Sequence, residues 1–348
     1  MKVGIHPDRY KEVSGFIRKY ETILRYNNIE VQYLHIDDPD FFENVKNFDA
    51  FIYRWFHYDY DRQLAGVILP LIRDKLRIPC FPDSYTDWHF DDKVRQYYLM
   101  KLNGFQMTES WIFWDRKDAV EWAEKASYPV VFKLKGGAGS QNVMLINNKR
   151  KAISLINKMF GKGIKDIGLV ERGSTVMNDF NLLKFLKVLF WKKKKLLQGR
   201  PAETFYHRQK NYVLFQKYLP GNGFDTRVTV IGDRAFAFRR FNRPNDFRSS
   251  GSGLIDHNNA EIDLQFVKMA FDVSKKLQFQ SMAYDFLYNE EHKPEFCEIS
   301  YSYLDTAVFS CKGFWDSQLN WHEGHYWPQF CQLQDLLKLP GLKQPEIS

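Results

Sequence analysis

The feature that most constrains the fold is a glycine-rich stretch at residues 128–143, which reads YPVVFKLKGGAGSQNV. Branched and aromatic residues on both sides of the glycines predict two strands, at 130–134 and 143–146. Three glycines within four residues predict a loop whose backbone N–H groups can approach an oxygen anion. Lys133 and Lys135 share one strand face at the mouth of this loop, where ammonium groups suit a polyphosphate.

Two interpretations of this stretch stay open. One is a phosphate-binding loop, and the other is a glycine-rich hairpin whose lysines are simply solvated. A P-loop is excluded, because no Gly-Lys-Ser/Thr sequence follows and no helix opens directly from the loop.

The composition allows a large interior and favours anionic partners. The chain has 348 residues, enough for two or three packed subdomains, and 44% of them are hydrophobic. The net charge of +8 favours nucleotides, acidic polymers or anionic membrane surfaces as partners. The first residues do not read as a signal peptide, no stretch is apolar enough to span a bilayer, and the four cysteines lack metal-site spacing. These features predict a cytoplasmic protein.

The first 84 residues are predicted to form a Rossmann-like α/β domain, because strand and helix patterns alternate there. Pro70 is expected to interrupt the last of these helices. The predicted strands lie at 2–5, 31–36 and 48–53, and the predicted helices at 13–24 and 67–76.

Further elements are predicted between residues 85 and 305. Asp91 and Asp92 suit the start of a helix that opens at Lys93. Strands are predicted at 111–114, 213–220, 227–231, 235–239, 282–288 and 295–300, and helices at 117–125, 151–160 and 262–277.

An insertion at residues 173–212 is unusually basic. Residues 179–191 place leucine and phenylalanine on one helical stripe with lysines beside it, and four lysines follow at 192–195. Such a helix can lie on an anionic membrane surface, so 179–195 is a candidate for peripheral contact with a membrane, at its inner face. A helix packed on its own domain, with a solvated basic end, is the slightly favoured alternative.

Two acidic residues stand out in the last two predicted strands. Asp285 and Glu298 can bring their carboxylates to one face of a hairpin, and Ser300 shares the face of Glu298. Oxygen ligands of this kind suit Mg²⁺ or Mn²⁺ that also binds nucleotide phosphates. The alternative for Asp285 is an ion pair with one of the many arginines.

Arginines gather around a second group of polar residues. Asp225 and Arg227 are separated by one residue, and Arg240 and Arg248 lie around a loop rich in glycine and serine. A guanidinium beside such a loop suits a phosphate or a carboxylate. Taken alone, this group would also fit a nucleic-acid surface.

Along the chain these motifs resemble those of the ATP-grasp ligases, especially the glutathione synthetase and ribosomal-protein glutamate ligase branch. Their order is Lys93, Lys133 with the glycine loop, residues 216–220, Asp225 with Arg227, Arg240 with residues 246–249, and Asp285 with Glu298. The resemblance covers residues 85–305 and rests on the order of six motifs, none of which is specific alone. It implies a nucleotide held between two α+β subdomains of a two-lobed ATP-grasp fold. The implied division is a preceding domain at 1–84, a central lobe at 85–125, a lid lobe at 126–218, a C-terminal lobe at 219–305 and a packed tail at 306–348.

The resemblance also implies a role for each matching residue. Lys93 and Lys133 would hold the α- and β-phosphates of ATP, and residues 216–219 would form a hinge whose backbone reads adenine. Arg227 and Arg240 would stabilise the transferred phosphoryl group. The implied set is Arg227, Arg240 and Arg248 for catalysis; Lys93, Lys133, Gly136, Gly137, Ala138, Gly139, Ser140, Gln216, Lys217, Tyr218, Leu219 and Asp225 for the nucleotide; and Asp285, Glu298 and Ser300 for Mg²⁺ or Mn²⁺. Ser300 departs from the family, which usually has Asn there, and a hydroxyl is a weaker ligand than an amide oxygen.

The implied reaction is ATP-dependent joining of a carboxylate to an amine through an acyl phosphate. A weaker resemblance, carried by residues 88–93, 298–301 and 315–324, is to bacterial ATP-grasp proteins associated with surface-polysaccharide synthesis. The candidate carboxylate substrates are therefore small molecules and a uronic-acid-containing glycan. Two alternatives stay open, an ATP-grasp kinase that phosphorylates a small molecule and a non-catalytic ATP-binding module. No nucleic-acid partner is expected.

Overall fold

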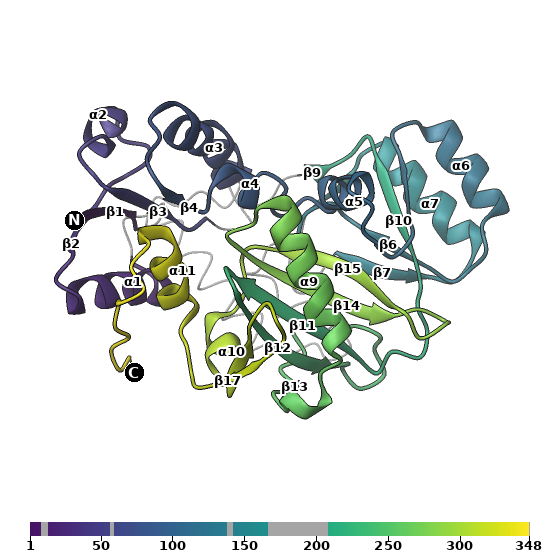
Figure 1. Ribbon diagram of the computed structural model, residues 1–348. Coiled ribbons are helices and arrows are strands. Elements are labelled where there is room, and N and C mark those ends of the chain that lie inside the picture. Colours follow the sequence, from purple (N-terminus) through teal and green to yellow (C-terminus); the bar gives the residue numbers. More distant parts are fainter. Residues whose placement is uncertain (8–12, 56–58, 138–141, 166–207, 348) are drawn as a thin grey trace, which may run out of the picture. The chain divides into compact units, whose positions relative to one another are not determined.

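The computed structural model describes residues 1–7, 13–55, 59–137, 142–165 and 208–347 (Figure 1). The chain divides into two compact units. Unit 1 consists of Met1–Phe56, Gln63–Phe90 and Gly221–Ser348, and unit 2 of His57–Arg62 and Asp91–Pro220. The predicted basic helix and the loop residues Ala138, Gly139 and Ser140 lie outside the described residues. Within the described ranges, no helix is both long enough and apolar enough to cross a membrane.

Unit 1 begins with a parallel sheet of four short strands in the order β2-β1-β3-β4. The alternation predicted for this part of the chain is observed, and β4 adds a strand within a segment that showed no strand pattern. The strands are β1 (Lys2–His6), β2 (Glu30–Tyr33), β3 (Ala50–Tyr53) and β4 (Cys80–Phe81). The accompanying helices are α1 (Gly15–Tyr26), α2 (Phe41–Val45), α3 (Asp59–Pro70), whose residues up to Arg62 belong to unit 2, and α4 (Ser84–Asp87). Pro70 ends α3, as expected, and one π-helical turn, Leu71–Lys75, follows.

The second sheet of unit 1 is antiparallel and has the order β15-β14-β11-β12-β16-β17, with β13 paired to β12. Its centre is the hairpin of β11 (Phe224–Ile231) and β12 (Arg234–Phe241), which turns at Gly232 with a positive φ of 54°. The other strands are β13 (Ile255–Asp256), β14 (Ser281–Tyr288), β15 (Pro294–Ser300), β16 (Gly313–Trp315) and β17 (Trp321–Glu323).

Helix α9 (Leu264–Leu277) covers one face of this second sheet (Figure 1). The Phe266 ring stacks on Phe286 with 4.7 Å between centroids, and the hydroxyls of Ser274 and Tyr284 are 2.6 Å apart. Because side chains alternate along a strand, residues next to Tyr284 and Phe286 point to the opposite face. The site of unit 1 is built on that opposite face.

The C-terminal part of unit 1 is packed against the first helix of the chain. Helices α10 (Asp305–Phe309) and α11 (Pro328–Leu337) follow the second sheet, and α11 lies beside α1 (Figure 1). The Tyr20 hydroxyl on α1 donates to Gln332 on α11, and Lys19 forms an ion pair with Asp305 at 3.1 Å.

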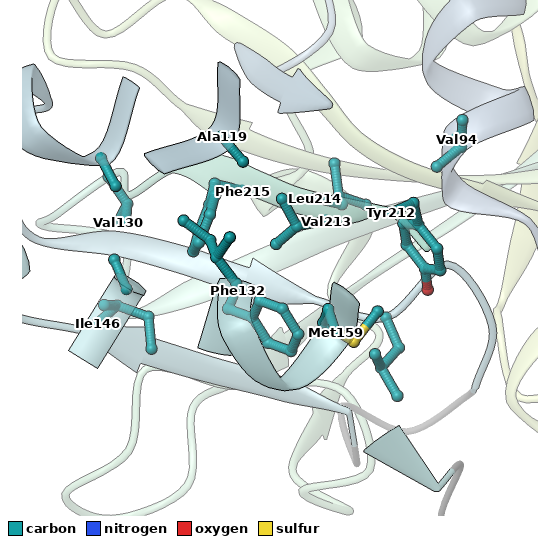
Figure 2. Packing of buried hydrophobic residues seen from close by; sticks show 14 residues of the cluster. Val94, Ala119, Val130, Phe132, Ile146, Met159, Tyr212, Val213, Leu214 and Phe215 are labelled. Atoms are coloured by element: carbon teal, nitrogen blue, oxygen red, sulfur yellow. The ribbon is translucent and has the colours of Figure 1, made fainter. Parts of the chain in front are cut away.

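Unit 2 contains an antiparallel sheet in the order β5-β10-β6-β7. One face of this sheet packs on α6 and α7 around Phe132, Phe215 and Met159, which are fully buried (Figure 2). The strands are β5 (Ser110–Phe113), β6 (Val130–Lys133), β7 (Val143–Ile146) and β10 (Val213–Lys217), and a separate pair is β8 (Ile164–Lys165) with β9 (Arg208–Gln209). The helices are α5 (Lys93–Leu102), α6 (Arg116–Lys125) and α7 (Lys149–Phe160).

Candidate functional site

The first group of candidate residues lies at the start of α5 and the end of β6, in unit 2. Asp92 caps α5 by accepting from the N–H groups of Val94 and Arg95, both at 3.1 Å. The Lys93 N–H donates to the Lys135 carbonyl at 2.9 Å, and this bond connects the first residue of α5 to the chain just beyond β6. The Lys93 ammonium donates to the Gly137 carbonyl at 3.0 Å. Lys93 and the glycine loop are therefore neighbours, although they are far apart in the sequence.

Lys133 lies on the sheet face that the core helices leave uncovered. Phe132 points into the core of unit 2, so Lys133 points the other way. Across the ladder Lys133 pairs with Leu214, and Gln216 lies two residues further along β10 on the same face. Lys133 is only 7% exposed, so its charge is largely withdrawn from water.

The predicted hinge, residues 216–219, leaves the sheet at the end of β10. Gln216 is buried and its side-chain amide donates to the Ser110 hydroxyl at 3.2 Å. The Lys217 N–H donates to the Glu109 carbonyl at 2.8 Å, so this N–H already has a partner in the sheet. Tyr218 is half-buried and Leu219 is buried.

The second group forms a ladder of charges across four strands of unit 1. Asp225 on β11 faces Arg240 on β12, Arg227 faces Asp285 on β14, and Asp285 faces Glu298 on β15. Cross-strand neighbours share a sheet face, so these five side chains lie on the face opposite α9. We call these five residues the charged face.

Two arginines hold the carboxylates of the charged face. Arg227 binds Asp285 through Nε at 2.6 Å and Nη2 at 2.8 Å, and Arg240 binds Asp225 through the same two nitrogens at 2.7 and 2.6 Å. Arg240 Nη2 also lies 2.8 Å from Asp285 Oδ2. Within the described part of the chain, the Nη1 group of both arginines makes no hydrogen bond.

The two aspartates of the charged face differ in acidity. Burial favours the neutral acid of Asp285, but Arg227 and Arg240 outweigh it and hold the pKa well below its usual range. For Asp225, burial raises the pKa, and the charge of Asp285 adds to this effect against the opposing charge of Arg240. Burial alone would lower the pKa of Arg240, but the carboxylates of Asp225 and Asp285 outweigh this effect and raise the pKa above its ordinary value, so this guanidinium stays charged.

Among the remaining predicted residues, Glu298 is the last member of the charged face, whereas Ser300 and Arg248 are not among its five residues. Glu298 is half-buried and follows Asp285 in the ladder. The Ser300 hydroxyl donates to the Ser302 carbonyl at 2.8 Å and accepts from the Ser302 N–H at 3.2 Å, so it is used in a local turn. Arg248 pairs with Asp246 at 2.6 Å, on the loop that follows β12. The ion-pair alternative for Asp285 is observed.

The donors fit Mg²⁺ or Mn²⁺ only as a partial set. Asp285 and Glu298 offer carboxylate oxygens from neighbouring strands, and the lowered pKa keeps Asp285 ionised, as a hard cation requires. No group of three or more His, Cys, Asp or Glu suited to a metal occurs among the residues that the structure describes. Such a site therefore depends on further oxygens, which nucleotide phosphates supply in many magnesium sites.

Sequence reasoning missed two residues beside the glycine loop. Asp91 accepts a hydrogen bond from the Gly137 N–H at 2.7 Å, and Arg62 pairs with Asp91 at 3.3 Å. Asp91 was predicted only as part of a helix start, and Arg62 carried no signal, because 29 residues separate it from Asp91.

The fold is similar to those of several solved structures. The RimK domain protein ATP-grasp from Sphaerobacter thermophilus DSM 20745 has 12% identity and a TM-score of 0.50, over 86% of this chain and 90% of that chain. D-alanine–D-alanine ligase from Bacillus anthracis complexed with ATP has 15% identity and a TM-score of 0.52, over 86% of each chain. N5-carboxyaminoimidazole ribonucleotide synthetase from Thermotoga maritima has 14% identity and a TM-score of 0.58, over 99% of this chain and 78% of that chain. No family model and no curated protein matches the sequence. The chain therefore has the ATP-grasp fold.

Proposed function

We propose that this protein is an ATP-dependent carboxylate–amine ligase that works through an acyl phosphate. The observation that carries the proposal is the charged face, where two arginines and three carboxylates meet on one sheet of an ATP-grasp fold. The similar structures include a ligase in complex with ATP and a synthetase, which supports the same class of reaction. A fold is shared by proteins of different activities, so the argument has to come from the residues themselves.

Lys93 and Lys133 are proposed to bind the phosphates of ATP. Both are buried, and Lys93 is anchored to the glycine loop through the Gly137 carbonyl. An ammonium carries three N–H donors and can bind several oxygen acceptors at once, including those of a phosphate. Charges placed before the reaction need no rearrangement when the phosphoryl group transfers.

Arg227 and Arg240 are proposed to stabilise the charge that develops on the transferred phosphoryl group. Their carboxylate partners fix the Nε and Nη2 edge of each guanidinium and leave Nη1 for a ligand oxygen. Their side chains are 17% and 7% exposed, so the charges act with little screening by water. Arg248 is a third candidate of this kind, on the loop after β12.

Asp285 and Glu298 are proposed to hold Mg²⁺ or Mn²⁺, with Ser300 as a weaker candidate because its hydroxyl is engaged with Ser302. When bound, the cation would neutralise charge on the phosphates. Asp225 does not take part directly in this proposal. Its contribution is to hold Arg240 in place through two hydrogen bonds.

The proposed chemistry has two steps. A carboxylate oxygen of the substrate attacks the γ-phosphorus of ATP, the bond to the bridging oxygen breaks, and ADP leaves. The nitrogen of an amine then attacks the acyl carbon, phosphate leaves with the former carboxylate oxygen, and the amine loses a proton. The residues named above position the reactants and stabilise the charge on the transferred phosphoryl group, and none of them has to form a covalent bond.

A screen of acids and amines for magnesium-dependent ADP release tests this proposal. A ligase releases ADP only when both an acid and an amine are present, and hydroxylamine in place of the amine yields a hydroxamate. Lys133→Ala should abolish ADP release while the protein remains folded. An alcohol that is phosphorylated without hydroxamate formation would instead identify a kinase, and ATP binding without any ADP release would identify a non-catalytic module.

For the substrate, we propose an acidic glycan, such as a uronic-acid-containing polysaccharide or its precursor. The net charge of +8 supports an anionic partner, although it does not choose among anions. Peripheral contact with an anionic membrane through 179–195 is proposed on the sequence pattern alone. If anionic liposomes do not bind the protein, and deletion of 178–197 leaves activity unchanged, the membrane contact is wrong.

A further inference from the structure

Asp91 has an unusual backbone and a buried carboxylate. Its φ is +52°, a left-handed conformation that residues other than glycine seldom adopt, although Asp and Asn tolerate it best. The residue is only 6% exposed. It lies immediately before the cap of α5, two residues from Lys93. A buried charge in a strained backbone conformation needs a compensating contact.

That contact is the glycine loop. Asp91 Oδ1 accepts from the Gly137 N–H at 2.7 Å, and the Lys93 ammonium donates to the Gly137 carbonyl at 3.0 Å. Both polar backbone groups of Gly137 are thus held by side chains from one short segment of the chain. Gly137 itself has a φ of +107°, which excludes most other residues.

Arg62 supports Asp91 from the other side. Its Nη1 lies 3.3 Å from both the carbonyl and the Oδ2 atom of Asp91. The fit around the loop is close, because a Cβ added to Gly136 would lie 3.0 Å from Arg62 Nη1 and 3.2 Å from Asp91 Oδ2. The carboxylate therefore has the guanidinium of Arg62 on one side and the Gly137 N–H on the other.

We infer that Asp91 is a positioning residue for ATP binding: its carboxylate fixes Gly137 and, through the Gly137 carbonyl, the ammonium of Lys93. This inference rests on the proposed function, since it requires the loop and Lys93 to bind ATP. It also predicts whether ATP affinity rises or falls when the charge of Asp91 is removed. By charge alone, removing an anion beside a phosphate site should strengthen ATP binding. By positioning, the same removal should weaken it.

The test compares Asp91→Asn with Asp92→Asn in the full chain. Asn keeps the size of Asp and tolerates the left-handed backbone, so Asp91→Asn removes the charge and replaces one of the two acceptor oxygens, which Gly137 and Arg62 both use, by an NH2 donor. Magnesium-ATP affinity is measured by calorimetry, and exchange of the Gly137 amide by mass spectrometry on short peptides. For Asp91→Asn we expect an affinity at least tenfold weaker than wild type and faster exchange at Gly137. Asp92→Asn keeps a side chain that can cap the helix and loses the ion pairs of Asp92 with Arg95 and Lys135, so it should leave the melting temperature close to that of wild type and change the affinity less than threefold.

The outcomes separate the two proposals. If Asp91→Asn binds ATP as tightly as wild type, or more tightly, the positioning role is wrong. If wild type itself does not bind ATP, the proposed function is wrong, whatever the exchange data show. Arg62→Gln provides a second variant in case Asp91→Asn does not fold, and it should also weaken ATP binding, by a smaller factor. Unchanged affinity in Arg62→Gln would contradict the support that Arg62 gives to Asp91.

Discussion

The charged face makes a sharp prediction about its two buried aspartates. Asp285→Asn should destabilise unit 1 much more than Asp225→Asn, although the two substitutions are chemically identical. Asp285 binds both arginines, and in the part of the chain that is described it is the carboxylate that Arg227 pairs with. Its loss leaves the half-buried guanidinium of Arg227 without this counter-ion. After loss of Asp225, Arg240 still has Asp285 at 2.8 Å.

The expected magnitudes follow from this difference. Breaking a buried ion pair by removing one partner costs about 3–5 kcal/mol, which we expect for Asp285→Asn. Asp225→Asn should cost about 1–3 kcal/mol, the range for a lost hydrogen bond to a charged group that keeps another partner. The two pKa shifts agree with this order. The environment favours the ionised form of Asp285, whose pKa is lowered, and disfavours that of Asp225, whose pKa is raised.

The pH dependence of each contribution has the opposite sign. The stability that Asp285 contributes is present above its unfolded pKa and is lost as pH falls through its lower folded pKa. Asp225 keeps its proton to higher pH in the folded protein than in the unfolded chain, so the proton-linked part of its contribution is largest at low pH and is lost as pH rises through its folded pKa. The destabilisation caused by Asp285→Asn should therefore shrink below pH 4, whereas that caused by Asp225→Asn should not.

Urea unfolding combined with hydrogen exchange of peptides from β11 and β14 measures these effects. Hydrogen exchange is needed because the two units need not unfold together. Glu291→Gln is the matched control. Its pair with Lys293 is 71% exposed on both sides, so this substitution should leave the stability close to that of wild type. Equal destabilisation by Asp225→Asn and Asp285→Asn, or the reverse order, would refute this account of the charged face.

Three further predictions follow from other parts of the structure. His6 is buried, which lowers its pKa to about 4, so the unfolded chain takes up a proton at a higher pH than the folded protein does. The free energy of unfolding of wild type should therefore fall by up to about 3 kcal/mol between pH 6.5 and pH 4. Urea unfolding of His6→Gln should not show this loss. Gly136→Ala should weaken ATP binding in calorimetry at unchanged melting temperature, because its methyl group crowds Arg62 and Asp91; unchanged affinity would contradict the close fit. Phe266→Ala should destabilise unit 1 by about 3–5 kcal/mol in urea, because it removes the ring that stacks on Phe286, and a loss below about 1 kcal/mol would show that α9 does not carry this core.

Much of the fold was predictable because it follows from local pattern. The strands at 130–134 and 143–146, and those at 282–288 and 295–300, are observed as β6, β7, β14 and β15 within a few residues. Alternation along these strands also predicted the shared face of Asp285 and Glu298, which the ladder places opposite each other. The capping signal at Asp92 predicted the start of α5.

The rest depended on contacts between distant segments. Strand β4 has two residues in a proline-bounded segment, too short for any periodicity, and it exists because β3 pairs with it. For Asp285, the sequence offered an ion pair with one of the many arginines only as the alternative, and it could not choose the partner. The register of β11 assigns Arg227 to Asp285. The contact of Arg62 with Asp91 has no local signal at all, since both residues are common at helix ends.

The central claim is that the protein binds ATP together with magnesium and that Lys133 and Glu298 are both needed for this binding. Calorimetric titration of ATP into wild type, Lys133→Met and Glu298→Gln, with and without Mg²⁺, tests it most directly. The account predicts magnesium-dependent binding by wild type, weak binding by Lys133→Met under both conditions, and loss of the magnesium dependence in Glu298→Gln. Wild-type affinity and magnesium dependence in either variant would contradict it.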